Sequence, residues 1–219
     1  MQKIDFKKTL KEFYGPSVKA PVLVTVPKLH YLMIDGKGDP NTALEYQQAI
    51  EALYGLAYTL KFMLKLGPEQ IDAVVMPLEG LWWVPEMSGF SMEDKAAWLW
   101  TAMIMAPEFI TREHVEKART QLEQKKNPPA LNKVRLESYD EGLAAQIMYL
   151  GAYADEAPTI QSLHEFIAEQ GYALKGKHHE IYLSDPRRTA PEKLKTVIRQ
   201  PCGQEPGNRG VQDAGSAFT

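Results

Sequence analysis

The 219-residue sequence lacks several features that mark familiar protein classes. It contains one cysteine, Cys202, which excludes an internal disulfide framework and a cysteine-based zinc site. No apolar run approaches the roughly 18 residues that a membrane span needs. The charged start has no apolar segment of the kind found in secretory signals. We therefore expect a cytoplasmic protein with no membrane partner.

A strong excess of one charge is also lacking. The 25 Lys and Arg residues nearly balance the 28 Asp and Glu residues, which gives a formal net charge of −3. Such a balance provides no general reason to bind nucleic acid. Residues 1–27 carry no run of arginines and are too short for a helix-turn-helix domain. We expect no direct contact with nucleic acid.

Common cofactor and catalytic motifs are absent as well. Residues 36–38 (Gly-Lys-Gly) are too short for a phosphate-binding loop, and His164–Glu165 lacks the second His of a zinc-binding helix. No Gly-x-Ser-x-Gly nucleophile turn is present. The adjacent His178 and His179 would face opposite sides of a strand, and no acidic or cysteine cluster completes a ligand set. We expect no metal and no cofactor.

What the sequence does contain is a pattern of two similar halves. Each half predicts a strand, a long helix and two further strands. In the first half these elements fall at residues 29–34, 42–64, 71–78 and 98–105. In the second half they fall at residues 143–150, 158–170, 178–183 and 194–199. A further charged helix is predicted over 111–126, and the segment 79–85, with two adjacent tryptophans, is predicted as a loop.

These two units can pair into a single antiparallel sheet with both helices on one face, so the predicted fold class is α+β. The other face would be open or lined by loops. The predicted domain spans 28–202. It follows an N-terminal extension, 1–27, in which residues 21–26 could form an edge strand. A tail over 203–219, rich in Gly, Ser, Asn and Gln, is predicted to be disordered.

Strand alternation assigns residues to the two faces of the predicted sheet. Ile181 and Leu183 would pack beneath the helices, so His178, Glu180 and Tyr182 would project from the helix-free face. Trp98 and Trp100 share a face, and together with Tyr182 and Glu180 they could form an aromatic cleft with one acid. Such a cleft suits a flat, apolar or cationic ligand. The ordinary alternative is that the tryptophans belong to the core and the glutamate is solvated.

Several segments resemble the GyrI-like small-molecule-binding family, which includes relatives of the DNA gyrase inhibitor and ligand-sensing domains of multidrug-responsive regulators. The resemblance covers about residues 28–202. The segments that carry it are His178-His-Glu-Ile-Tyr-Leu-Ser-Asp-Pro-Arg187 and the segments at residues 77–83, 146–153, 156–160 and 195–201. It implies two strand–helix–strand–strand modules in a pseudo-twofold arrangement, with a ligand cleft between them.

Within this family, the Trp-Trp and His-Glu-Ile-Tyr features look like a stand-alone branch implicated in hydrolysing cyclopropane-bearing, DNA-alkylating compounds. Glu180 matches the acidic position that sensor members use to meet cationic aromatic drugs. The chain departs from the family's Gln-x-x-His-x-Gly-Pro-Tyr pattern, because Tyr149 stands in place of His and Ala152 in place of Pro. Either Tyr149 substitutes for that His or the mechanism differs.

Two functions follow as hypotheses. In a hydrolase that protects against toxic alkylators, Glu180 would be the general base, and Tyr149 or Tyr182 would donate a hydrogen bond to the developing oxyanion. A second carboxylate could come from Glu79. The expected ligand-binding residues are Trp82, Trp83, Trp98, Trp100, Glu79 and His178. In a non-catalytic sensor or sequestering protein, Glu180 would instead be a counter-ion. The sequence is compatible with a protein partner or a homodimer.

Overall fold

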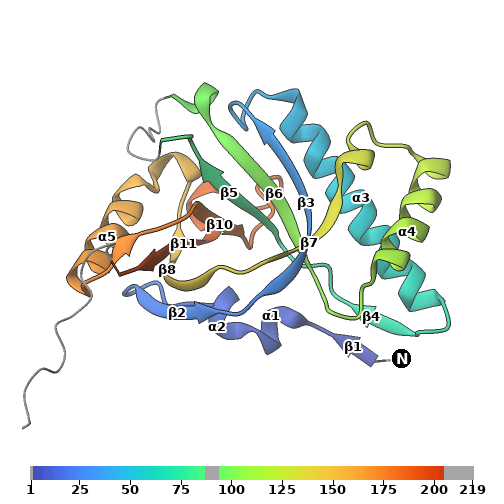
Figure 1. The fold of residues 1–219 in the computed structure, drawn as a ribbon, viewed down its shortest axis with the longest axis horizontal. Helices are drawn as coiled ribbons and strands as arrows, with labels where there is room; N and C mark the ends of the chain where they lie inside the picture. The colour runs from blue at the N-terminus through green and yellow to red at the C-terminus, as the bar shows by residue number, and fades with distance from the viewer. Residues whose placement is uncertain (1, 87–93, 205–219) are drawn as a thin grey trace, which may run out of the picture.

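The computed structural model describes residues 2–86 and 94–204 of the protein, and residues 205–219 of the predicted tail lie outside them. A nine-stranded sheet with antiparallel pairing forms the body of the molecule (Figure 1). Its strand order is β2-β8-β11-β10-β5-β6-β3-β7, and β9 pairs with the end of β11. The first half of the sheet contains β3 (Leu29–Lys37), β5 (Leu78–Trp83), β6 (Leu99–Ala106) and β7 (Arg135–Tyr139). The second half contains β2 (Val22–Val26), β8 (Gly142–Leu150), β9 (Ala173–Leu174), β10 (His178–Tyr182) and β11 (Lys195–Gly203).

The helices are α1 (Phe6–Thr9), α2 (Lys11–Tyr14), α3 (Leu44–Leu66), α4 (Arg112–Lys125) and α5 (Ala157–Glu169). Short 3₁₀ helices are η2 (Lys95–Ala97), η3 (Leu131–Lys133), η4 (Tyr153–Asp155) and η5 (Pro191–Lys193). None of the helices in the described ranges is long and apolar enough to cross a lipid bilayer.

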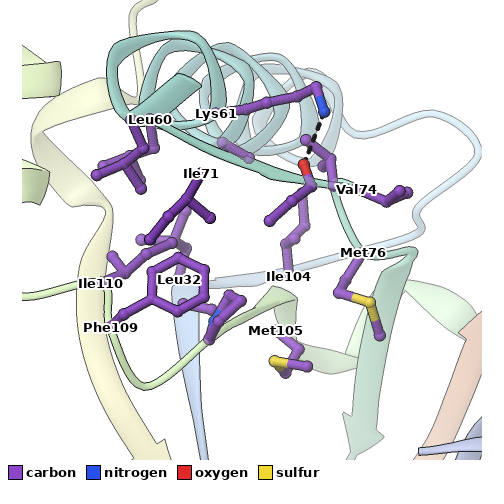
Figure 2. Close-up of a pocket in the computed structure, with 16 residues that line it drawn as sticks. Leu32, Leu60, Lys61, Ile71, Val74, Met76, Ile104, Met105, Phe109 and Ile110 are labelled. Carbon is purple, nitrogen blue, oxygen red and sulfur yellow. Dashed lines mark hydrogen bonds between the residues drawn. The ribbon is translucent and has the colours of Figure 1, made fainter. Parts of the chain in front are cut away.

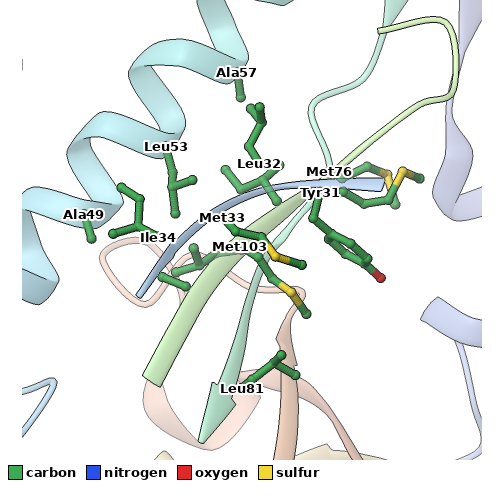
Figure 3. Packing of buried hydrophobic residues seen from close by; sticks show 14 of the residues in the cluster. Tyr31, Leu32, Met33, Ile34, Ala49, Leu53, Ala57, Met76, Leu81 and Met103 are labelled. Carbon is green, nitrogen blue, oxygen red and sulfur yellow. The ribbon is translucent and has the colours of Figure 1, made fainter. Parts of the chain in front are cut away.

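The two long helices of the predicted modules pack on the same face of the sheet, as expected. Ala49, Leu53 and Ala57 of α3 point toward Leu32 and Ile34 of β3 (Figure 3). In the other half, α5 packs on β8 and β11, where the buried cluster comprises Leu163, Ile167, Ile147 and Ile198. One row of directly paired residues runs across the sheet from the region under α3 to the region under α5. Its members are Ile34, Ala102, Gly80, Glu180, Ile198 and Ile147. Paired residues share a face, so the predicted α+β fold class with helices on one face is confirmed.

The opposite face of the sheet is covered by the N-terminal segment. The Tyr14 hydroxyl of α2 donates to Glu79 on β5 over 2.8 Å, and Arg199 of β11 donates to the Phe13 carbonyl over 2.6 Å. The segment also supplies β1 (Gln2–Ile4), which pairs in parallel with β4 (Ile71–Ala73), and β2, which pairs with β8. Both faces of the central strands are therefore buried.

Three local predictions were wrong. The segment 79–85 was predicted as a loop, but 78–83 forms the central strand β5. Of the predicted strand 71–78, only 71–73 form a strand, β4, which pairs with β1 apart from the main sheet; residues 74–77 lead to β5, and β7 was not predicted. The loop was predicted over 79–85 because glycine, here Gly80, is common in turns. A Cβ at position 80 would lie 2.8 Å from the Trp82 indole nitrogen, so glycine is needed there to make room for a side chain.

Candidate functional site

A cleft of about 940 Å³ opens on the helix-bearing face, between the two modules. Its floor comes from β5 and β10, one wall from α3, and the other from η2, η4 and the start of α5. The residues at its deep end are Trp82, Glu180, Tyr182, Tyr46, Trp98, Tyr153, Glu156 and Lys95. Its volume is in the range of small-molecule sites, which are about 300–1,000 Å³.

A second cavity, beneath the C-terminal half of α3, is far smaller. It measures about 40 Å³ and is lined mainly by apolar side chains such as Leu32, Leu60 and Ile104 (Figure 2). A single water needs roughly 10–15 Å³ of such space, so this cavity is too small for an organic ligand. It is a packing defect, and the large cleft is the candidate site.

The position of the cleft corrects the expectation that Glu180 and Tyr182 face away from the helices. Both side chains lie on the helix-bearing face, in the gap between α3 and α5. Ile181 faces the other side and is fully buried there. The prediction assumed that only one face of the sheet is covered, whereas the N-terminal segment gives the second face a core of its own.

Aromatic rings form the walls of the deep end. The ring centroids of Trp82 and Trp98 are 5.5 Å apart, and Tyr46 lies 5.6 Å from Trp82. On the opposite side, Tyr153 packs edge-on against Tyr182 at 5.5 Å. These separations are typical of aromatic pairs in contact, so the rings pack against one another around the deep end.

The other two predicted tryptophans do not line the cleft. Trp100 is fully buried behind Tyr46, with ring centroids 5.0 Å apart. Trp83 faces the opposite side of β5, where the Lys177 amino group lies 3.4 Å from its ring centroid. The adjacent tryptophans therefore separate to the two faces, as alternation along a strand requires.

Glu180 is a buried carboxylate held by hydrogen bonds at both oxygens. The Tyr182 hydroxyl donates to Oε2 over 2.7 Å, and Nε2 of His178 lies 3.2 Å from Oε1. Trp82 in turn donates its indole N–H to the Tyr182 hydroxyl over 3.2 Å. Burial raises the pKa of Glu180, but the hydrogen bonds and charge of His178, with Tyr182, outweigh it and hold the pKa below the ordinary value. Glu180 is therefore ionised near neutral pH.

Glu156, which was not among the predicted site residues, faces Glu180 from the start of α5. Its side chain is buried, and Oε2 has no hydrogen-bond partner among the described residues. Burial, the charge of Glu180 and a hydrogen bond with Glu180 raise the pKa of Glu156 to about 9. Two carboxyl groups this close share one proton, so Glu156 is the neutral member of the pair.

The remaining predicted residues lie outside the cleft. His178 lies 3.2 Å from Glu180 and is not among the residues that line the cleft. Tyr149, on β8, donates its hydroxyl to the Ala152 carbonyl over 2.9 Å and does not reach the cleft. Glu79 is fully buried on the opposite face. The structure thus brings together Glu180, Tyr182, Trp82 and Trp98, and it separates the others from them.

Glu79 belongs to a buried ionic network on that opposite face. His179 lies between two carboxylates, with Nδ1 2.8 Å from Glu141 and Nε2 3.0 Å from Glu79. Arg199 donates to the other oxygen of Glu141 over 3.0 Å. Burial lowers the pKa of His179, but the two glutamates outweigh it and raise it to about 9. The network pairs buried positive and negative side chains, and Glu79 also accepts a hydrogen bond from Tyr14. Its role is therefore to stabilise the fold.

Among residues 2–86 and 94–204, no group of three or more His, Cys, Asp or Glu side chains could hold a metal ion. The adjacent His178 and His179 point to opposite faces of β10, each toward carboxylates. The chemistry that the site itself offers is that of an acid, a carboxylate and aromatic surfaces.

The α+β domain has an aromatic cleft between two helix-bearing modules, with carboxyl groups at the floor of the cleft. This arrangement is that of a small-molecule-binding protein. The sequence profile of the GyrI-like small molecule binding domain matches residues 19–201. The chain belongs to this family, which confirms the resemblance drawn from the sequence.

Solved structures agree with this assignment. An uncharacterized conserved protein from Listeria innocua is 42% identical, with a TM-score of 0.85 over 91% of this chain and 100% of that one. A hydrolase encoded by lin2189 from Listeria innocua is 41% identical, with a TM-score of 0.83 over 92% of this chain and 100% of that one. The EcmrR C-terminal domain, at 11% identity and a TM-score of 0.51 over 84% of this chain and 97% of that one, shares the fold alone. A comparison with curated proteins finds no match.

Proposed function

We propose that this small-molecule-binding protein hydrolyses electrophilic, cyclopropane-bearing compounds with flat aromatic frameworks, and so protects against toxic alkylators. The observation that carries the proposal is the Glu180 carboxylate, which is buried at the floor of an aromatic cleft and accepts a hydrogen bond from Tyr182. The similarity to the hydrolase encoded by lin2189 from Listeria innocua, which is 41% identical to this chain, supports hydrolysis.

Glu180 would act as a general base on a water molecule. A cyclopropane conjugated to a carbonyl opens when the water oxygen attacks a ring carbon, and the electrons of the broken C–C bond move to the carbonyl oxygen. The base removes a proton from the water as the new C–O bond forms. A positioned base of this kind contributes about 10²–10⁴-fold to the rate.

Tyr182 would position the base rather than stabilise the oxyanion. Its hydroxyl proton is already donated to Glu180, and its oxygen accepts from Trp82. This chain of hydrogen bonds fixes the carboxylate and favours its ionised form. The sequence-based role of Tyr182 as oxyanion donor would require this hydrogen bond to break.

The aromatic walls would hold the flat part of the substrate. Trp82, Trp98 and Tyr46 present ring surface at the deep end, next to the acid pair. Stacking on these rings orients the electrophilic carbon, and exclusion of bulk water strengthens the electrostatic interactions of the carboxyl groups.

A second function uses the same site without chemistry. An ionised carboxylate among aromatic faces is also a site for a flat organic cation, with Glu180 as counter-ion and the rings supplying cation–π contacts. The protein would then sequester or sense such compounds. The two functions differ in what happens to the ligand after binding.

The test compares parent protein, Glu180→Gln and the control Glu165→Gln, which changes an exposed glutamate of α5. Each is incubated with a panel of cyclopropane electrophiles and cationic dyes, and the compounds are analysed by mass spectrometry. The proposal expects water addition to a cyclopropane by parent and control, and loss of turnover with retained binding in Glu180→Gln. Recovery of every compound unchanged, with persistent quenching of tryptophan fluorescence, would replace hydrolysis by sequestration.

A further inference from the structure

Glu156 is a buried acid with an unused oxygen. It is 3% exposed, it lines the cleft, and its Oε2 has no hydrogen-bond partner among the described residues. An unpartnered buried polar atom is costly for the folded protein, by about 1–3 kcal/mol. The missing hydrogen-bond partner of such an atom can be supplied by a ligand or a reacting group.

We infer that Glu156 is the proton donor of the proposed hydrolysis and protonates the carbonyl oxygen of the substrate as the ring opens. The inference rests on the proposed function, and it adds a second catalytic residue to the base Glu180. The two carboxyl groups lie on separate elements, β10 and the start of α5, so the fold places them on adjoining sides of one bound molecule.

The proton and electron balance closes within the pair. Water loses one proton to Glu180 as its oxygen bonds to the ring carbon. The ring C–C bond breaks, its electron pair moves through the conjugated system to the carbonyl oxygen, and Glu156 gives that oxygen a proton. Glu180 then returns its proton to the neighbouring Glu156, which restores the starting protonation of the pair. The net reaction is the addition of one water molecule.

The tyrosines at the deep end are weaker proton donors. Burial raises the pKa of Tyr153 to about 12, and it raises the pKa of Tyr46 further still. The Tyr182 hydroxyl is engaged with Glu180. Glu156, with a pKa of about 9, is protonated near neutral pH and is a stronger acid than either tyrosine. General-acid catalysis is most effective with a donor of this kind.

Among residues 2–86 and 94–204, the titratable and charged groups that face the pair come from the elements around the cleft. They are Lys95 of η2, Tyr46 of α3, Tyr153 of η4, and His178 and Tyr182 of β10. Lys95 acts on Glu156 in the opposite sense to burial and lowers its pKa. The burial effect and the charge of Glu180 outweigh Lys95, so the proton stays on Glu156.

The test measures kcat/KM against pH for the parent, Glu156→Gln and the exposed control Glu165→Gln. The parent and control should show a plateau that falls through about pH 9, as Glu156 loses its proton. Glu156→Gln should lower the plateau by about 10²–10⁴-fold and should lack this alkaline limb. Melting curves confirm that the variant is folded, and infrared difference spectra should show that it lacks a protonated-carboxyl C=O band present in the parent near neutral pH.

The outcomes separate the two proposals. If the parent opens no cyclopropane, the proposed function fails, and the inference fails with it. If the parent is active and folded Glu156→Gln retains its rate or its alkaline limb, only the role of Glu156 is overturned. A lowered plateau with an unchanged alkaline limb also overturns it, because the variant would then have lost positioning rather than a proton donor.

Discussion

Tyr182→Phe tests the hydrogen-bond chain that holds the base. The substitution removes only the hydroxyl, which donates to Glu180 over 2.7 Å and accepts from Trp82 over 3.2 Å. A hydrogen bond to a charged group contributes about 1.5–3 kcal/mol. Because about 1.36 kcal/mol corresponds to a tenfold change in proton affinity, the carboxylate should bind protons about ten- to a hundredfold more tightly.

This change predicts a loss of activity that depends on pH. The acid limb of the kcat/KM profile should shift to higher pH by about one to two pH units. This shift is an upper bound, because His178 still contacts the other oxygen of Glu180. At about pH 8 the variant should retain most of its activity, because Glu180 is still ionised there. As the pH falls, the variant should lose activity before the parent does, because Glu180 takes up its proton at a higher pH in the variant.

The assay is a pH–rate profile of Tyr182→Phe beside Tyr172→Phe, a tyrosine that packs against the α5 cluster away from the cleft. An acid limb that stays in place refutes the positioning role of Tyr182. An equal loss at all pH values refutes it in a different way, since that pattern belongs to a hydroxyl that contacts the developing oxyanion.

Two further predictions concern residues outside the cleft. Tyr149→Phe should leave kcat/KM unchanged, since its hydroxyl donates to the Ala152 carbonyl; a large loss of turnover would show that Tyr149 reaches the substrate. Glu141→Gln should reduce the free energy of unfolding by about 3–5 kcal/mol, measured by urea denaturation, because it breaks a buried network with His179 and Arg199. In the parent, the stabilisation from His179 should be fully present below its unfolded pKa and should decline as pH rises through about 9. That from Glu141 should be present above its unfolded pKa and should decline as pH falls through about 2; a pH-independent urea midpoint over both ranges would contradict this assignment.

The alternation of β10 was predictable because it depends only on strand geometry. His178, Glu180 and Tyr182 share a face, and His179 and Ile181 share the other, as the pairing with β5 requires. The identity of each face was not predictable, because the N-terminal segment buries the second face and the apolar residues no longer mark the helix side. The buried positive charges of His179 and Arg199 are balanced by glutamates on that second face, which a search for apolar core residues overlooks.

Glycines within strands made part of the sheet difficult to predict from the sequence. A Cβ at Gly36 would lie 2.2 Å from Trp100, and one at Gly80 would lie 2.8 Å from Trp82. Both glycines stand within strands and leave room for an indole, whereas a sequence pattern assigns glycine to strand ends and loops. A glycine two residues before a tryptophan, on the same face of one strand, was the signal that could have identified β5.

Glu156 was missed because its role depends on three-dimensional proximity. In the sequence it marks the start of α5, where an acidic residue is ordinary. Its approach to Glu180 follows from packing α5 on the same face as α3, beside β10. The sequence thus pointed to Glu180 and two aromatic walls, and the fold was needed to find Glu156.

The most direct test of hydrolysis by the carboxylate in this cleft uses water labelled with ¹⁸O. Parent protein and Glu180→Gln are each mixed with a cyclopropane electrophile in labelled water, and the masses of product and protein are measured. The proposal predicts that the parent releases a product carrying one labelled oxygen, that the protein mass is unchanged, and that Glu180→Gln produces no more than the uncatalysed reaction. Equal labelled product from both proteins, or a covalent adduct on the parent, would contradict it.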